Sequence, residues 1–173
     1  HQASSDVCLL DVATREYRRL DAVNSDRAES YPRWSSNGRW IVFLSNRREG
    51  PSNIKGMPVF YRNRIYVAVG GDIWWGKNKA WLECIDATAS GDITATGRVW
   101  SYPLERHACT TPSIADGLVY VADCGGNVHC VDAETGAPYW VHDAGREIWG
   151  STLVADGKVY VGTRRGVLWI LKA

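Results

Sequence analysis

The histidines and cysteines are the side chains best suited to metal or redox chemistry, and their spacing limits what they can do. His107 and Cys109 stand two residues apart on an expected strand, so both side chains can lie on one face of a sheet. A zinc site needs three or four ligands. The sequence has no C-x-x-C pair that would add ligands to His107 and Cys109. We therefore predict no metal site, and ordinary polar or buried roles for His107, His129 and His142.

A disulfide between Cys124 and Cys130 is the most obvious pairing, and hairpin geometry argues against it. A two-residue turn at Gly125-Gly126 would place Cys124 opposite Asn127, and moving the turn by one residue would place Cys124 opposite His129. In neither register do the two cysteines face each other, and a disulfide requires Cα atoms within about 7 Å. We predict that Cys130 stays reduced.

The segment at residues 70–81, GGDIWWGKNKAW, carries the strongest candidates for binding a partner. Trp74 and Trp75 are adjacent, so on extended backbone their side chains point in opposite directions and are not both expected to be buried. Exposed tryptophans favour protein interfaces. We predict that Asp72, Trp74, Trp75 and Lys77 bind a protein partner. The alternative is that one tryptophan only caps the edge of a sheet.

Composition narrows the class of protein that positions these residues. Of the 173 residues, 20 are Lys or Arg and 19 are Asp or Glu, which leaves a net charge of +1 and no basic block for nucleic acid. No apolar run approaches the roughly 20 residues of a membrane-spanning helix. Nine tryptophans, 17 glycines and one methionine favour an all-β chain of short strands joined by glycine turns.

The chain repeats itself, and the repeat predicts a β-propeller. The sequence TTPSIADGLVYVAD from Thr110 aligns with GSTLVADGKVYVGT from Gly150 at a period of 40, and an earlier copy, MPVFYRNRIYVAVG, starts at Met57. The extra residues of that copy fall in an inserted loop at 70–80 and in the stretch 88–97. Each copy reads as up to four antiparallel strands with tight glycine turns, and repeated four-stranded units of about 40 residues are typical of propeller blades. We predict an all-β fold with about four blade units, incomplete or part of a larger propeller.

One stretch of the repeat carries a family resemblance. CVDAETGAPYW at residues 130–140 resembles the tryptophan-docking motif of the pyrroloquinoline quinone (PQQ)-like propeller repeats, through Asp132, Thr135, Gly136 and Trp140. The resemblance covers about residues 57–173. That family includes quinoprotein dehydrogenases and non-enzymatic lipoproteins of outer-membrane assembly.

The motif has a structural interpretation that requires no cofactor. Asp132 can accept hydrogen bonds from the N–H groups of its turn, Gly136 can adopt a conformation that a Cβ forbids, and Trp140 can pack between neighbouring blades. A stretched copy contains Asp86 and Trp100. Cys84 and Cys130 occupy equivalent positions in their copies, so we predict two reduced cysteines packed between blades.

The first 50 residues resemble a different repeat. Residues 6–50 are similar to TolB-type propeller repeats, which carry a Pro-x-Trp-Ser run followed by glycine and an Ile-x-Phe-x-Ser-x-Arg strand. The matching residues are Pro32, Trp34, Ser35, Gly38, Ile41, Phe43, Ser45 and Arg47. We expect Trp34 to be a structural residue of this repeat.

Counting strands places a seam between the two repeat types. We expect successive groups of two, two, four, four and three strands, fifteen in all, with a TolB-like portion at 1–50 and PQQ-like repeats at 51–173. The spacing near residues 47–57 is too short for a whole blade. A segment is missing there, or residues 48–56 form an ordinary long loop to a degenerate blade.

These observations predict a binding protein without catalytic residues. We expect a non-catalytic scaffold for protein–protein interaction, and the resemblances imply a bacterial periplasmic or cell-surface location. The alternative is a fragment of a quinoprotein dehydrogenase, which would imply PQQ with calcium. The sequence has no adjacent cysteine pair and no recognisable carboxylate set for that metal. It also lacks the G-x-S-x-G elbow of the serine peptidases to which TolB-type propellers are sometimes attached.

Overall fold

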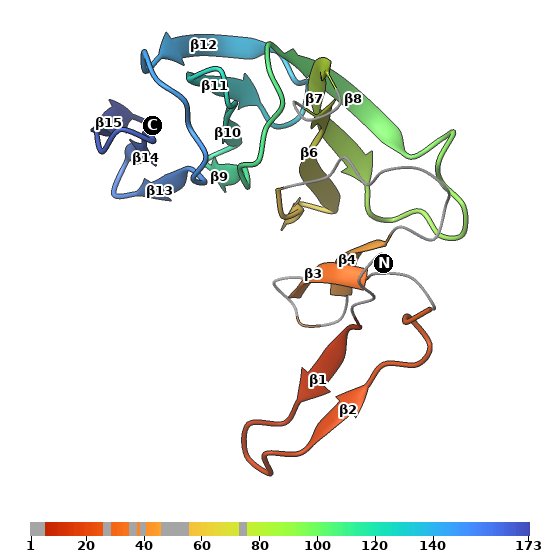
Figure 1. The fold of residues 1–173 in the computed structure, drawn as a ribbon. Coiled ribbons are helices and arrows are strands. Elements are labelled where there is room, and N and C mark those ends of the chain that lie inside the picture. Colours follow the sequence, from red (N-terminus) through yellow and green to blue (C-terminus); the bar gives the residue numbers. More distant parts are fainter. Residues whose placement is uncertain (1–5, 26–28, 35–37, 39–40, 46–55, 73–75) are drawn as a thin grey trace. The chain divides into compact units, whose positions relative to one another are not determined.

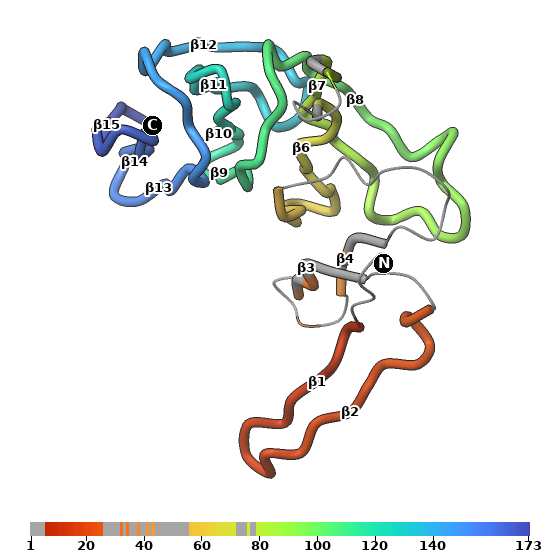
Figure 2. The backbone as a smooth tube through the Cα atoms, in the orientation of Figure 1, coloured from red at the N-terminus to blue at the C-terminus, as the bar shows by residue number. Residues whose placement is uncertain are grey.

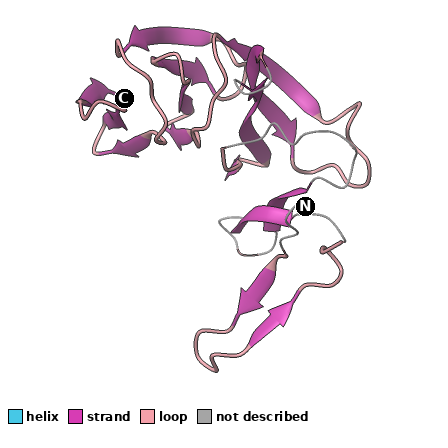
Figure 3. Ribbon diagram, in the orientation of Figure 1, coloured by secondary structure: helices cyan, strands magenta, loops and turns pink. Residues whose placement is uncertain are grey.

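The chain folds as a series of antiparallel β-sheets. The computed structural model describes residues 6–25, 29–34, 38, 41–45, 56–72 and 76–173. Within these residues there are fifteen strands in five sheets and no helix (Figures 1 and 3). The chain divides into two compact units, 1–52 and 53–173.

The first unit holds two two-stranded sheets, β1–β2 and β3–β4. The strands are β1 (Cys8–Leu10), β2 (Tyr17–Arg19), β3 (Glu29–Trp34) and β4 (Ile41–Ser45). The β1–β2 connection is shaped by Asp11, whose carboxylate accepts hydrogen bonds from the N–H groups of Ala13 and Thr14 at 2.8 and 3.0 Å. The base of this hairpin is tied by Asn24, which bonds both the N–H and the carbonyl of Val7.

The second unit is three consecutive meander sheets, which we call blades I, II and III (Figure 2). Blade I consists of β5 (Val59–Tyr61), β6 (Arg64–Asp72), β7 (Lys77–Asp86) and β8 (Arg98–Leu104). Blade II consists of β9 (Ser113–Ala115), β10 (Leu118–Ala122), β11 (Asn127–Asp132) and β12 (Pro138–Asp143). Blade III consists of β13 (Leu153–Ala155), β14 (Lys158–Gly162) and β15 (Leu168–Lys172).

The first hairpin turn is the same in blades II and III. Asp116 and Gly117 between β9 and β10 both have positive φ, at 50° and 82°, and Asp156 and Gly157 repeat this in blade III. Two successive residues of positive φ give the two-residue hairpin turn whose twist matches that of the strands it joins. The predicted strand groups of two, two, four, four and three are confirmed.

Apolar side chains bury the faces between successive blades. Between blades I and II, Tyr66, Leu82 and Cys84 of blade I pack with Val119 and Val131 of blade II, and all five are fully buried. Two further clusters join blade II to blade III. The middle strands β10 and β11 are therefore buried on both faces.

The register of the β10–β11 hairpin differs from both predicted registers. Tyr120 lies opposite Cys130, and the strands are closed by a 2.9 Å hydrogen bond from Asp123 N to Asn127 O. The loop has three residues instead of two, with Gly126 at a φ of 107°. Three-residue hairpins of this kind end in a residue of positive φ. Cys124 is therefore in the turn itself and has no cross-strand partner.

The segment 70–81 is mostly strand, so the prediction of an inserted loop there is wrong. β6 continues to Asp72 and β7 begins at Lys77, and these two residues are backbone partners across the hairpin. The pairing shifts between Gly70 and Asp72, which accommodates the extra length as a bulge. Trp74 and Trp75 lie outside the described residues, as does most of the predicted seam at 47–57.

Candidate functional site

The Asp132 turn, between β11 and β12, is built from its own side chains. Asp132 Oδ1 accepts hydrogen bonds from the N–H groups of Glu134 and Thr135 at 2.9 and 2.8 Å, and from Thr135 Oγ1 at 2.9 Å. The pKa of Asp132 lies below its usual value, chiefly because its carboxylate accepts a hydrogen bond from the Thr135 N–H. In blade I, Asp86 makes a similar turn with the N–H and hydroxyl of Thr88.

Blade I holds this turn of blade II through aromatic and polar contacts. The Trp100 indole N–H donates to Ala133 O at 3.1 Å, and the Tyr66 hydroxyl donates to the same oxygen at 3.0 Å. The ring of Trp100 lies so close to Gly136 that a Cβ there would be 2.7 Å from Cδ2. Gly136 is thus required twice, by its φ of 72° and by this close approach.

A charged contact completes the attachment between the two blades. Arg64 Nη1 donates to Glu134 O at 2.8 Å, and Arg64 Nη2 pairs with Glu134 Oε2 at 2.7 Å. The sequence reasoning missed both Arg64 and Tyr66. The repeat carried a signal for Tyr66, because a tyrosine recurs at the equivalent positions of the later copies, Tyr120 and Tyr160.

The other predicted motif tryptophans have different surroundings. Trp140 is half-buried, joins both clusters between blades II and III, and lies 6.0 Å from the ring of Tyr120 at a tilt of 42°. Trp34, in the first unit, is 56% exposed on β3.

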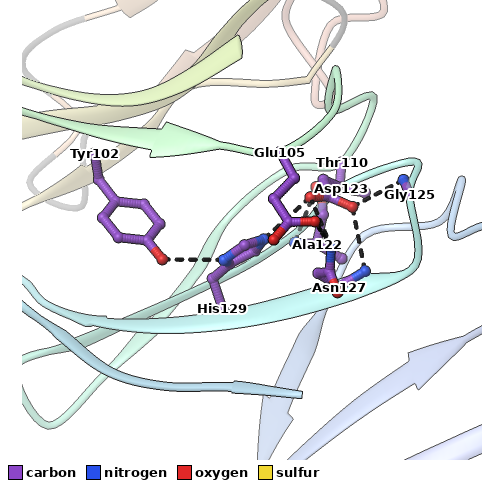
Figure 4. A network of polar contacts seen from close by, with 8 residues as sticks. All are labelled: Tyr102, Glu105, Thr110, Ala122, Asp123, Gly125, Asn127 and His129. Atoms are coloured by element: carbon purple, nitrogen blue, oxygen red, sulfur yellow. Dashed lines mark hydrogen bonds and ion pairs between the residues drawn. The ribbon is translucent and has the colours of Figure 1, made fainter. Parts of the chain in front are cut away.

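A buried polar network lies between β8, β11 and the β10–β11 turn (Figure 4). Tyr102 of β8 bonds His129 Nδ1 at 3.1 Å, and His129 Nε2 lies 3.2 Å from Asp123 Oδ2. Asp123 Oδ1 in turn accepts hydrogen bonds from the N–H groups of Gly125 and Asn127 at 2.8 and 3.2 Å. The network thus runs from blade I across β11 to the β10–β11 turn.

The Asp123 carboxylate is held ionised inside the protein. Burial alone would raise its pKa, but hydrogen bonds from His129 and Asn127 more than offset this effect, so the pKa of Asp123 lies below its usual value. The side chains of His129 and Asp123 are 2% and 0% exposed. Both groups are thus closed to solvent, and the network joins two blades and fixes the β10–β11 turn.

Two of the five cysteines belong to a cluster of potential metal ligands that the sequence did not predict. All five are thiols without a disulfide, and Cys84 and Cys130 stand opposite Tyr66 and Tyr120 in matching register. The sulfur atoms of Cys109 and Cys124 and a ring nitrogen of His107 lie within 4.8 Å of one another. The sequence had paired His107 with Cys109 as neighbours on one strand, but both lie in the irregular link between β8 and β9. The third residue, Cys124, comes from the turn whose register was mispredicted.

An open, arginine-rich cleft of about 500 Å³ lies between three connections of blades II and III. It is lined by Gly125, Gly145, Arg146, Glu147, Arg164 and Arg165. Arg164 is paired with Glu147 at 2.8 Å.

The fold and the blade-fastening turn define a propeller built from PQQ-type repeats, and comparison with known proteins agrees. Residues 78–173 match the family described as outer membrane protein assembly factor BamB. This match covers more than half of the chain, and the chain belongs to this family. It begins at residue 78, so the TolB-type resemblance of residues 6–50 stays a prediction.

Relatives and solved structures extend the comparison. The chain is 31% identical over 108 residues to quinohemoprotein alcohol dehydrogenase of Comamonas testosteroni, covering 51% of this chain and 14% of the relative. It is 34% identical over 90 residues to 1-butanol dehydrogenase (cytochrome c) of Thauera butanivorans, covering 44% and 13%. The chain therefore spans only about a seventh of these enzymes.

A solved structure shows the same fold. BamB from Moraxella catarrhalis matches 78% of this chain and 36% of its own at 22% identity, with a TM-score of 0.54. This likeness supports the β-propeller fold. In the described residues, no helix is long and apolar enough to cross a membrane.

Proposed function

We propose that this chain is a non-catalytic propeller scaffold that binds a protein partner. The observation that carries the proposal is that the motif residues are used to fasten blade to blade. Asp132 accepts the hydrogen bonds of its own turn, and Trp100 and Tyr66 hold Ala133. In the Tyr102–His129–Asp123 network, His129 and Asp123 are buried from solvent. The parts left for recognition are the hairpin tips and connections.

The family supports this role, since its description is that of an assembly factor. A location in the bacterial periplasm or at the cell surface accords with that description and is part of the proposal. The TolB-type character of residues 6–50 is proposed on sequence resemblance alone.

The tip of the β6–β7 hairpin is the surface we propose for the partner. Asp72 and Lys77 are backbone partners at the end of the β6–β7 pairing, and Trp74 and Trp75 stand between them in the sequence. A paired base with two aromatic residues beyond it suits an anchor in a protein interface.

The test places a photo-crosslinking amino acid at Trp74 in the full-length protein, in its native cells. Adducts of one defined mass are expected, and Trp75→Ala in the same chain should reduce their yield severalfold. The matched control places the same group at Tyr139, which is 63% exposed on β12. Equal adducts at both positions, or none at Trp74, would count against the proposed surface.

A second candidate, part of a quinoprotein dehydrogenase, is favoured by the two enzyme relatives. Calcium prefers oxygen ligands. In the described part of the chain, the one cluster of potential ligands offers sulfur and imidazole instead. The described residues therefore do not fit that metal. Extraction of a quinone from the purified full-length protein, with alcohol-dependent dye reduction, would favour the enzyme.

A further inference from the structure

Three potential metal ligands converge where the link from blade I to blade II passes the β10–β11 turn. His107 and Cys109 belong to the link between β8 and β9, and Cys124 belongs to the turn. Their ligand atoms all lie within 4.8 Å of one another. Tetrahedral zinc with Zn–S bonds of about 2.3 Å and Zn–N bonds of about 2.0 Å needs ligand atoms about 3.5–3.8 Å apart. The three atoms are therefore at most about 1.3 Å too far apart for that geometry.

The backbone holds the two segments side by side. Cys124 N donates to His107 O at 2.9 Å. Thr110 Oγ1 donates to Ala122 O and accepts from Ala122 N at 3.3 Å. Each cysteine thus lies within two residues of a bond that joins the segments. This arrangement limits the reorganisation that binding an ion would require.

The surroundings of the three ligands suit a partly enclosed ion. His107 is 3% and Cys124 7% exposed, whereas Cys109 is half-buried and gives access from solvent. His107 lies against Gly71, where a Cβ would come within 2.2 Å of His107 Cβ. The ring of Trp149 meets the His107 imidazole edge-on at 6.3 Å. These contacts restrict the rotation of the imidazole.

We propose that His107, Cys109 and Cys124 bind a thiophilic divalent ion of the zinc class. Two thiolates and one imidazole form the donor set that selects such ions over calcium or magnesium. On binding, each thiol loses its proton to solvent, so the ion with two thiolates and a neutral imidazole carries no net charge. That neutrality suits a buried site. Three protein ligands leave a fourth position for water or an added ligand.

The test uses the reduced, metal-free protein and adds Co²⁺, whose thiolate complexes absorb in the near ultraviolet, followed by displacement with Zn²⁺. One equivalent per chain is expected by absorbance and by elemental analysis. Cys109→Ser should weaken binding at least tenfold, since loss of one ligand removes a metal–sulfur bond. Cys130→Ser, at a buried cysteine outside the cluster, should bind as the parent does.

Several outcomes decide against the site. Equal binding by Cys109→Ser and Cys130→Ser would overturn the proposal, as would a reduced parent chain that takes up no cobalt. Isolation of a Cys109–Cys124 disulfide that forms equally fast with and without Zn²⁺ would also overturn it, because bound zinc should protect both thiols. Circular dichroism of each variant checks that lost binding does not come from unfolding. None of these results depends on whether the chain binds a protein partner.

Discussion

The contact between blades I and II depends on Gly136 for two reasons. Its φ of 72° disfavours any side chain, and a Cβ would meet Trp100 at 2.7 Å. We expect Gly136→Ala to lower the free energy of unfolding by about 2–4 kcal/mol, from backbone strain and overpacking together. Urea denaturation measures this loss.

Gly157→Ala separates these two effects. Gly157 has a φ of 67°, and beyond its chain neighbours no atom lies within 4 Å of the position that a Cβ would take, so only backbone strain applies. The loss of stability should be about 1 kcal/mol. Equal losses for the two variants would show that Trp100 yields to the methyl group and that the close approach carries no energy.

Cys130 and Tyr120 are predicted to make the fold sensitive to alkali. Burial raises the pKa of Cys130 to about 11, and burial together with Cys130 raises the pKa of Tyr120 to about 12. In the unfolded chain these groups titrate at about 8.5 and about 10. At a pH between the unfolded-state and the folded-state pKa values of these groups, the unfolded chain binds fewer protons than the folded one. The stability present below about pH 8.5 is therefore lost as the pH rises to about 11–12.

Unfolding by urea at about pH 8 and about pH 10.5 tests this loss. Cys130→Ala removes one titrating group and should make the fall in stability between the two pH values shallower, by up to about 1.4 kcal/mol per pH unit. Cys8→Ala, at an exposed position on β1, should leave the fall unchanged. An identical pH dependence in Cys130→Ala and the parent would contradict the prediction.

At the scale of elements, the contact of β6 and β8 with the Asp132 turn should be cooperative. Tyr66 and Trp100 make the two short hydrogen bonds to Ala133 O, at 3.0 and 3.1 Å, and Arg64 Nη1 reaches the same oxygen only at 3.4 Å, so either short bond alone keeps that carbonyl well satisfied. Tyr66→Phe and Trp100→Phe should each cost about 0.5–1.5 kcal/mol, and the double variant should cost at least about 0.5 kcal/mol more than their sum. A cycle of Tyr66→Phe with Tyr102→Phe, which bonds His129 instead, should be additive. Additivity in both cycles would mean that the shared acceptor does not couple the strands.

Strand number and order were predictable because the repeat aligns on glycine turns and apolar strands, which depend on local sequence. The register of β10–β11 was not, because the Asp123 side chain organises a three-residue turn where Gly125-Gly126 pointed to a two-residue one. Because of this wrong register, the sequence did not predict that Cys124 lies beside His107 and Cys109. The close approach of Trp100 to Gly136 could not be predicted either, because Trp100 belongs to another blade.

One row of side chains recurs in each blade of the second unit, and in blade III this row is largely exposed. Tyr66, Cys84 and Trp100 pair across blade I and are covered by blade II. Tyr120 and Cys130 do the same in blade II and are covered by blade III. The cross-strand partners that form the equivalent row of blade III are Leu153, Tyr160 and Ile170. This row has the apolar character of a face that a neighbouring blade covers.

This row should make the 173-residue chain associate with itself in solution. Leu153 is 60% and Ile170 56% exposed on the same face of blade III, and exposed apolar patches of this kind promote association. We expect sedimentation velocity to show association that rises with concentration, and Ile170→Lys to reduce it at least severalfold. The free energy of unfolding should change by less than about 0.5 kcal/mol, because the side chain is exposed. Tyr139→Lys, at an equally exposed position on β12, is the control and should associate as the parent does. A parent chain that stays monomeric, or an equal effect of both substitutions, would rule out this face as the contact.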